Sequence, residues 1–361
     1  MHRLTRDEAR RIAVRAQLLD AQRPGDIIEV AEQLGVIKID PTAVIAPAEQ
    51  AIPWSRIGWG YEPGQLTKAA DERLLYEFDG QFYAASVMPA LVSRIRQRPL
   101  RAREKEYLDG NAAFRREIIA RLRADGPLAS GEIADTSAVQ RGTESGWYGS
   151  SQVPLMLELL ARIGEVAVHG REGRQRRWDL AERVYPPDLP LYDYDEAGRM
   201  RDAQRLQALG IARRKSSWSG VGEAGEAAEV EGSTWKWRVD PEAVAALDED
   251  PGGRAAILNP YDRMLFDRPR LTELFEFTYV LEQFKPKAQR VYGYFAHPIL
   301  VGDRFIGLLD AALDKKRETL QVAAVHELVP FDDDEREMVD AEIHELAEWL
   351  GVPVEFASGA R

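Results

Sequence analysis

Cysteine is absent from the 361 residues, and this absence excludes several kinds of site at once. A chain without thiols has no disulfides, zinc–thiolate sites, iron–sulfur clusters or cysteine nucleophiles. Histidine is also scarce: the five histidines stand at positions 2, 169, 297, 326 and 344, with no pair at the spacing of metal ligands. We therefore expect a protein of a reducing compartment, the cytoplasm, that uses no metal and no cofactor.

Long apolar runs are missing as well. No stretch approaches the roughly 20 apolar residues that a membrane-spanning helix needs, and the first residues, MHRLTRDEARR, are polar and charged. Apolar residues make up 45% of the chain and charged residues 30%, which is typical of a soluble globular protein. A chain of this length is too long for one hydrophobic core, so we expect a monomer of two or three compact units, with no membrane partner.

Positive charge is in deficit overall, with 48 basic against 60 acidic residues and a net charge of −12. Two segments account for the whole excess: residues 331–350 hold nine acidic residues and one basic residue, and residues 221–231 hold four acidic residues. Residues 94–123, by contrast, hold ten basic residues against four acidic ones. Because binding of a polyanion depends on the local field more than on total charge, the acidic balance does not exclude DNA.

The N-terminal residues have the pattern of a small helical module with one strand. A capping box predicts a helix over about 5–19. Two further helices are expected over 26–34 and 48–57, with a short strand over 36–40 between them. This order is that of a winged helix-turn-helix core, so we expect a first module over residues 1–100.

The same order recurs more clearly over residues 101–186. Helices are expected over 103–123, 130–135 and 151–163, and a hairpin over 164–180 follows them. The hairpin carries four arginines: Arg171, Arg174, Arg176 and Arg177. A basic hairpin in this position is a wing that contacts DNA, although charged hairpin tips are also common on surfaces that bind nothing.

The remaining residues change from helical to strand-like patterns. Residues 187–254 hold a linker, a helix ending near Gly210 and a loop-like stretch, and we expect a degenerate third winged helix or a linker there. Residues 255–361 are expected to form an antiparallel β-barrel-like domain with an acidic C-terminal helix. Its strands are expected over 276–284, 290–300, 304–310 and 320–325. The fold class is therefore α+β, with tandem winged helix-turn-helix modules on a C-terminal antiparallel barrel.

Several sequence motifs resemble one known family. They are NPYD (259–262), FDR (266–268), LFEFTYVLE (274–282), RVYGY (290–294), PILVGDR (298–304), RRWDLAERVYP (176–186) and WSRIG (54–58). The chain is similar over roughly residues 5–325 to the winged-helix, crosslink-repair DNA glycosylases of the AlkZ/YcaQ type. This resemblance implies winged-helix modules and a barrel around double-stranded DNA. It also implies excision of N-alkylated purines and unhooking of interstrand crosslinks.

The resemblance further implies a catalytic motif on the strand of the first module. The family has Gln-x-Gln or Gln-x-Asp there, and the aligned triplet is Lys38-Ile39-Asp40. On a strand, Lys38 and Asp40 share one face, opposite the apolar isoleucines. An N7-alkylated purine is already cationic and needs no general acid to leave. A carboxylate such as Asp40 can stabilise the oxocarbenium-like sugar and align a water.

Both motif residues also have a second interpretation. The Lys38 amine could attack the sugar and form a Schiff base, but a carboxylate on the same face favours its charged form. We therefore prefer a phosphate contact or an ion pair for Lys38. Asp40 precedes Pro41 and could be a turn residue that accepts a backbone hydrogen bond.

The function expected is that of a monofunctional DNA glycosylase. DNA contacts are expected from Arg56, Arg94, Arg96, Arg171, Arg174, Arg176 and Arg177. The alternative is a non-catalytic winged-helix protein that binds DNA, such as a regulator or a damage sensor. The replacement of the first glutamine by Lys38 favours this alternative, and the retention of Asp40 favours the enzyme.

Overall fold

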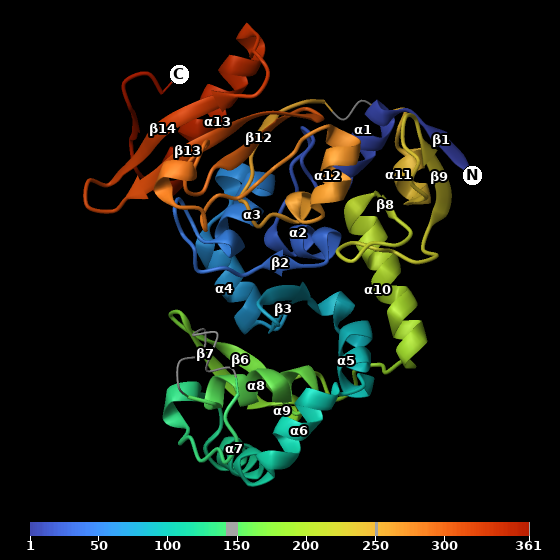
Figure 1. Ribbon diagram of the computed structural model, residues 1–361, viewed down its shortest axis with the longest axis vertical. Coiled ribbons are helices and arrows are strands. Elements are labelled where there is room, and N and C mark those ends of the chain that lie inside the picture. The colour runs from blue at the N-terminus through green and yellow to red at the C-terminus, as the bar shows by residue number, and fades with distance from the viewer. Residues whose placement is uncertain (142–150, 250–251, 361) are drawn as a thin grey trace. The chain divides into compact units, whose positions relative to one another are not determined.

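The computed structural model describes residues 1–141, 151–249 and 252–360, which form two compact units (Figure 1). The first unit combines residues 1–69 with residues 202–361, and the second holds residues 70–201. Helices and strands are mixed in both, so the α+β class is confirmed. The first unit contains residues from three of the four expected domains: 1–100, 187–254 and 255–361. The division into four domains stays a prediction.

The N-terminal helices of the first unit follow the expected pattern. Helix α1 (Arg6–Ala16) begins with the capping box of Thr5 and Glu8. Helix α2 (Ile27–Leu34) is capped by the Asp26 side chain and ends at Gly35, whose φ of 69° suits a residue without Cβ. The elements that follow are β2 (Ile37–Lys38), α3 (Ala48–Ile57) and α4 (Pro63–Asp71).

A four-stranded sheet joins the N-terminus to residues 211–239. Its order is β1 (His2–Leu4), β9 (Glu226–Val230), β10 (Trp237–Val239) and β8 (Ile211–Arg213). Helix α10 (Tyr194–Leu209) ends beside Gly210, as expected. Strand β9 lies within a stretch expected as a loop, where buried Ala228 and Val230 alternate with glutamates. Short helix α11 (Pro241–Ala245) follows this sheet.

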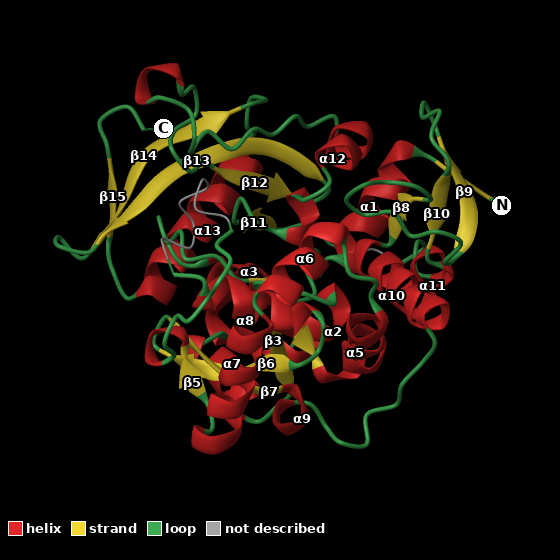
Figure 2. Ribbon diagram, turned by 60° about the horizontal axis from the view of Figure 1, so that its bottom comes forward, coloured by secondary structure: helices red, strands yellow, loops and turns green. Residues whose placement is uncertain are grey.

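The C-terminal residues form a five-stranded sheet and, among the described residues, no closed barrel. The strands are β11 (Ala255–Ile257), β12 (His297–Val301), β13 (Arg304–Asp314), β14 (Thr319–Glu327) and β15 (Val354–Phe356), in that order. The first four pair antiparallel and β15 pairs parallel with β14. The acidic helix α13 (Asp333–Leu350) packs against β11 and β12 (Figure 2). The barrel expectation is thus corrected to an open sheet.

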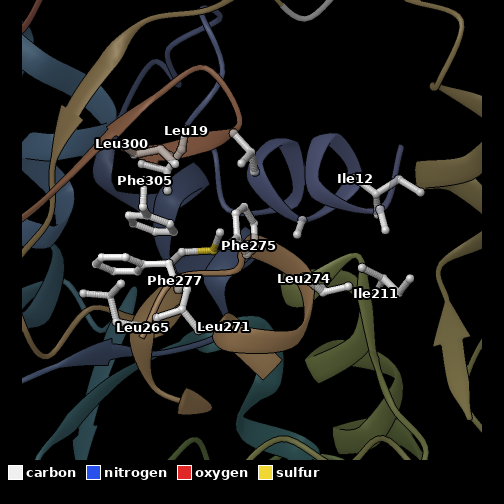
Figure 3. Close-up of a cluster of buried hydrophobic side chains, with 14 of the residues drawn as sticks. Ile12, Leu19, Ile211, Leu265, Leu271, Leu274, Phe275, Phe277, Leu300 and Phe305 are labelled. Carbon is white, nitrogen blue, oxygen red and sulfur yellow. The ribbon is translucent and has the colours of Figure 1, made fainter. Parts of the chain in front are cut away.

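The strand expected over 276–284 is wrong, and the strand expected over 290–300 begins only at His297, as β12. Helix α12 (Arg268–Phe275) precedes this stretch, and the residues up to β12 are irregular, apart from one 3₁₀ turn at Lys287–Gln289. Phe277, Tyr279 and Phe295 fill the core instead of pairing in a ladder, whereas Phe284 and Tyr294 are exposed. Phe277 stacks on Phe305 with ring centroids 4.5 Å apart (Figure 3). The aromatic residues of this stretch therefore indicate packing of part of it into the core, and they do not indicate a strand.

The second unit contains two hydrophobic clusters, to which both helices and strands contribute, and a three-stranded sheet of order β5-β7-β6. Its elements are β3 (Leu75–Phe78), β4 (Gln81–Ala84), α5 (Met88–Gln97), α6 (Ala102–Gly110), α7 (Ala112–Asp125), β5 (Leu128–Ala129), α8 (Val153–Arg162), β6 (Val166–Glu172), β7 (Gln175–Leu180) and α9 (Ala181–Val184). The helix expected over 103–123 is broken at Asn111, whose side chain bonds the backbone of Ala138 and Val139. The helix expected over 130–135 is one 3₁₀ turn, Ser130–Glu132.

Among the described residues, no helix is long and apolar enough to cross a membrane.

Candidate active site and nucleic-acid interface

Strand β2 holds only Ile37 and Lys38, which is shorter than the strand expected over 36–40, and Ile39 and Asp40 follow it outside regular secondary structure. Ile37 and Ile39 are buried, whereas Lys38 and Asp40 are half-buried. Helix α3 packs against this strand. The alternation expected for residues 37–40 is therefore present, and the two polar side chains stay out of the apolar core.

Asp40 is held by a turn and keeps one oxygen open. Its Oδ1 accepts a hydrogen bond from the backbone N–H of Thr42 at 2.9 Å. Its own backbone N–H donates to Oε2 of Glu49 at 3.1 Å. Within the described part of the chain, Oδ2 of Asp40 accepts no hydrogen bond. The turn interpretation is thus correct for one carboxylate oxygen, and the second oxygen remains available to a water or a substrate.

Glu49 is a neighbour of Asp40 that the sequence pattern did not reveal. It lies in the first turn of α3, where an acid is ordinarily explained by the helix dipole. Nearby, the hydroxyl of buried Tyr61 donates to Oε1 of Gln50 at 2.6 Å. Burial, with a further contribution from the charge of Glu49, raises the pKa of Tyr61 far above its usual value. Tyr61 is therefore a fixed hydrogen-bond donor and not an acid.

Arg56 does not lie on a DNA-binding surface. Its side chain is fully buried and forms a two-pronged ion pair with Asp262, in which Nη2 lies 3.0 Å from Oδ1. Its Nε donates to the backbone carbonyl of Gln17 at 3.1 Å. These bonds leave no donor facing water, so the expectation that Arg56 contacts DNA is corrected to a structural role.

Two of the four arginines on the hairpin are bound to one buried carboxylate. Arg171 donates through Nε and Nη2 to Glu77, at 2.6 and 2.7 Å, and Arg176 donates to the same carboxylate. The Glu77 side chain is only 3% exposed. Arg176 also pairs with Glu158, and the nearby charges of Glu77 and Glu158, outweighing burial, raise the pKa of Arg176. Both arginines therefore carry compensated charge.

The other two arginines of the hairpin differ in their surroundings. Arg177 pairs with Glu132 at 2.6 Å and donates to the carbonyl of Pro127. Arg174 lies at the tip beside Gly173, whose φ is 59°, and is exposed. Within the described residues the side chain of Arg174 has no ion-pair partner. Of the arginines of this hairpin, Arg174 is the one whose charge no described residue compensates.

Arg94 and Arg96 on α5 show a similar contrast. Arg94 lies over the ring of Tyr194, 4.0 Å from its centroid, and donates to the hydroxyl and carbonyl oxygens of that residue. Arg96 is exposed, and the described residues offer it no ion pair. Of the arginines expected to bind DNA, Arg96 and Arg174 therefore present the most accessible charges.

Comparison with known proteins identifies the family of the chain. The family model described as "DNA glycosylase AlkZ-like" matches residues 31–349, a range that includes Lys38 and Asp40. Among solved structures, the DNA glycosylase AlkZ of Streptomyces sahachiroi superposes with a TM-score of 0.65 at 15% sequence identity, covering 99% of this chain and 100% of that one. At this identity the superposition shows a shared fold, while the family match extends over most of the sequence. The chain belongs to the AlkZ-like family of DNA glycosylases, which are hydrolases of N-glycosyl bonds.

Proposed function

We propose that this DNA glycosylase excises N-alkylated purines, including purines of interstrand crosslinks, and that Asp40 is its catalytic carboxylate. The observation that carries the proposal is the geometry of Asp40: a half-buried carboxylate with one oxygen fixed by Thr42 and the other open. A negative charge held in place where positive charge develops lowers the barrier without reorganisation.

The reaction needs few groups from the protein. Water attacks the anomeric carbon of the sugar, the carbon–nitrogen bond to the base breaks, and its electron pair neutralises the cationic purine. The Asp40 carboxylate stabilises the oxocarbenium-like sugar and takes a hydrogen bond from the attacking water, whose proton then passes to the carboxylate or to solvent. Glu49 acts through Asp40, since it holds the backbone N–H of that residue.

Lys38 is proposed to contact a phosphate of the DNA. It replaces the first glutamine of the family motif. This enzyme would therefore position the DNA with the charged amine of Lys38, where its relatives use the amide of a glutamine. A Schiff-base mechanism is the alternative for the same amine. Borohydride reduction in the presence of an alkylated duplex separates the two, because only a Schiff base leaves the protein covalently bound to DNA.

The finer architecture also belongs to this proposal. The order α6, α7, 3₁₀ turn, α8 and a hairpin in residues 102–180 supports a winged helix whose wing tip is Arg174. We further propose a winged helix in the first module and a degenerate one within residues 187–254. A monomer working in the cytoplasm on double-stranded DNA is the corresponding expectation for the whole chain.

The substrate test uses two duplexes of one sequence, with and without a single N7-methylguanine. The protein should generate abasic sites in the methylated duplex only, seen as strand cleavage after alkaline treatment. A second pair, with and without a nitrogen-mustard crosslink, tests unhooking. Tight binding of both alkylated duplexes without release of any base would contradict the proposed substrate class.

A further inference from the structure

One loop of the first unit exposes a large aromatic side chain to solvent. Phe284 is 84% exposed, and its neighbours on the loop, Val280 and Val291, are 55% and 69% exposed. We call residues 280–291 the Phe284 loop. Single apolar residues on a surface need no explanation, but three on one loop, with a phenylalanine among them, mark a contact surface.

The loop is fixed at its base and does not fold over its own aromatic. Buried Glu282 accepts hydrogen bonds from the backbone N–H groups of Val291 at 2.7 Å and Tyr292 at 2.9 Å. It also accepts one from Nζ of Lys285 at 2.8 Å. Glu282 is only 4% exposed and joins both arms of the loop, so it sets the position of the loop tip. Phe284 is thus exposed on a loop that these hydrogen bonds hold in one conformation, which lowers the entropy cost of binding.

The charge around Phe284 fits a polyanion. The loop carries Lys285, Lys287 and Arg290, and the sequence has no acidic residue from 283 to 302. Lys287 is exposed and, within the described residues, forms no ion pair. The guanidinium of Arg290 lies 4.9 Å from the ring centroid of Tyr294, which keeps it near the surface. An exposed aromatic beside uncompensated cations is the combination that binds bases and phosphates together.

We propose that Phe284 inserts into the base stack of duplex DNA beside the target nucleotide, while Lys287 and Arg290 contact the flanking phosphates. This inference rests on the proposed function, because a base must leave the stack before it can be excised. Proteins that distort a duplex often place an apolar side chain between base steps and gain contacts from the resulting bend. Phe284 is then a positioning residue that favours the extruded base and does not touch the sugar.

The test separates unstacking from excision. A duplex carries 2-aminopurine next to a 2′-fluoro-N7-methyldeoxyguanosine, whose glycosidic bond resists cleavage, and the fluorescence rise on binding reports unstacking. F284A should lose most of this rise, and F284W should restore it because a larger aromatic face can fill the same space. V329A is the matched control: Val329 is 40% exposed in the same unit and precedes the acidic residues 332–335. It should behave as wild type.

Single-turnover excision of N7-methylguanine from the ordinary duplex gives the second readout. F284A should slow it by about tenfold or more, the value of one lost base–aromatic contact, with rescue by F284W. Unchanged fluorescence and excision in F284A would overturn the proposal. An equal fall in F284A and F284W, or a fall in V329A as large as that in F284A, would overturn it too. If wild type releases no base but still unstacks DNA through Phe284, the proposed catalytic function fails while this inference stands.

Discussion

Arg56 and Asp262 form an ion pair in the interior of the first unit, although 206 positions separate them in the sequence. Both side chains have no exposed surface. Arg56 belongs to the WSRIG segment and Asp262 ends the NPYD segment, so two separate motifs of the resemblance meet in one contact. The contact between these motifs therefore attaches α3 to the C-terminal part of the unit, and it is not part of a binding surface.

Removing one partner of this pair should destabilise the protein strongly. Asp262→Asn leaves the Arg56 guanidinium buried without a counter-charge, which typically costs about 3–5 kcal/mol. Urea unfolding, followed by tryptophan fluorescence, measures the free energy of unfolding. Arg121→Ala is the control, since the Arg121–Asp125 pair is exposed and such pairs contribute about 0–1 kcal/mol. Equal losses in the two variants would contradict a structural role for Arg56.

Local signals in the sequence predicted local structure well. The capping box at Thr5 and the cap residues Asp26 and Gly35 stand where the helices begin and end, because their hydrogen bonds involve near neighbours. Contacts between distant residues were not predictable in this way. The sequence predicts a DNA contact for Arg56, and this prediction is wrong because the buried partner of Arg56, Asp262, lies 206 positions away. Glu77 likewise stands 94 positions from Arg171, and no spacing in the sequence indicates that it pairs with two arginines of the hairpin.

The hairpin arginines should separate into two classes on mutation. Arg174→Ala should weaken binding to duplex DNA of any sequence and reduce the slope of log affinity against log salt by about one unit. The free energy of unfolding should stay within about 0.5 kcal/mol, as is usual for an exposed residue. Fluorescence anisotropy at four salt concentrations checks the slope.

Arg176→Ala should instead act on stability. The variant leaves buried Glu77 with one arginine instead of two, and loss of a charged hydrogen-bond partner costs about 1–3 kcal/mol. Thermal or urea unfolding of this variant beside Arg174→Ala gives the comparison. A stable Arg176→Ala protein with lost DNA affinity would show that the Glu77 pairing is unimportant in solution.

Glu342 should give the first unit a pH-dependent stability. It lies buried on α13, with Arg23 3.5 Å away, and burial raises the pKa of Glu342 to about 7. Its contribution is fully present below the ordinary value near 4.5 and is lost as the pH rises through 7. The free energy of unfolding of Glu342→Gln relative to wild type should therefore rise between pH 5 and 8, by up to about 3 kcal/mol.

Glu348→Gln is the matched control for this measurement, because Glu348 lies on the same helix and is exposed. Its stability relative to wild type should stay nearly constant over the same pH range. A constant difference for Glu342→Gln as well would show that this carboxyl is ionised in the folded protein throughout.

Lys38→Gln tests how this chain uses its altered motif. The substitution restores the glutamine of the family pattern, so base excision should be kept or increased, while the salt dependence of DNA binding weakens by about one phosphate contact. Loss of all excision in Lys38→Gln, together with borohydride trapping of wild type on DNA, would replace the hydrolytic mechanism by a Schiff-base one.

The central claim is that the Asp40 carboxylate performs the chemistry, and the most direct measurement is single-turnover release of N7-methylguanine by Asp40→Asn. Asparagine keeps the shape and can still accept the hydrogen bond from Thr42, but it removes the negative charge. Release should fall by roughly a hundredfold to a thousandfold, since losing electrostatic stabilisation of this kind costs about 3–4 kcal/mol. Affinity for the same duplex should stay unchanged or rise slightly. Release at the wild-type rate by folded Asp40→Asn would contradict the account.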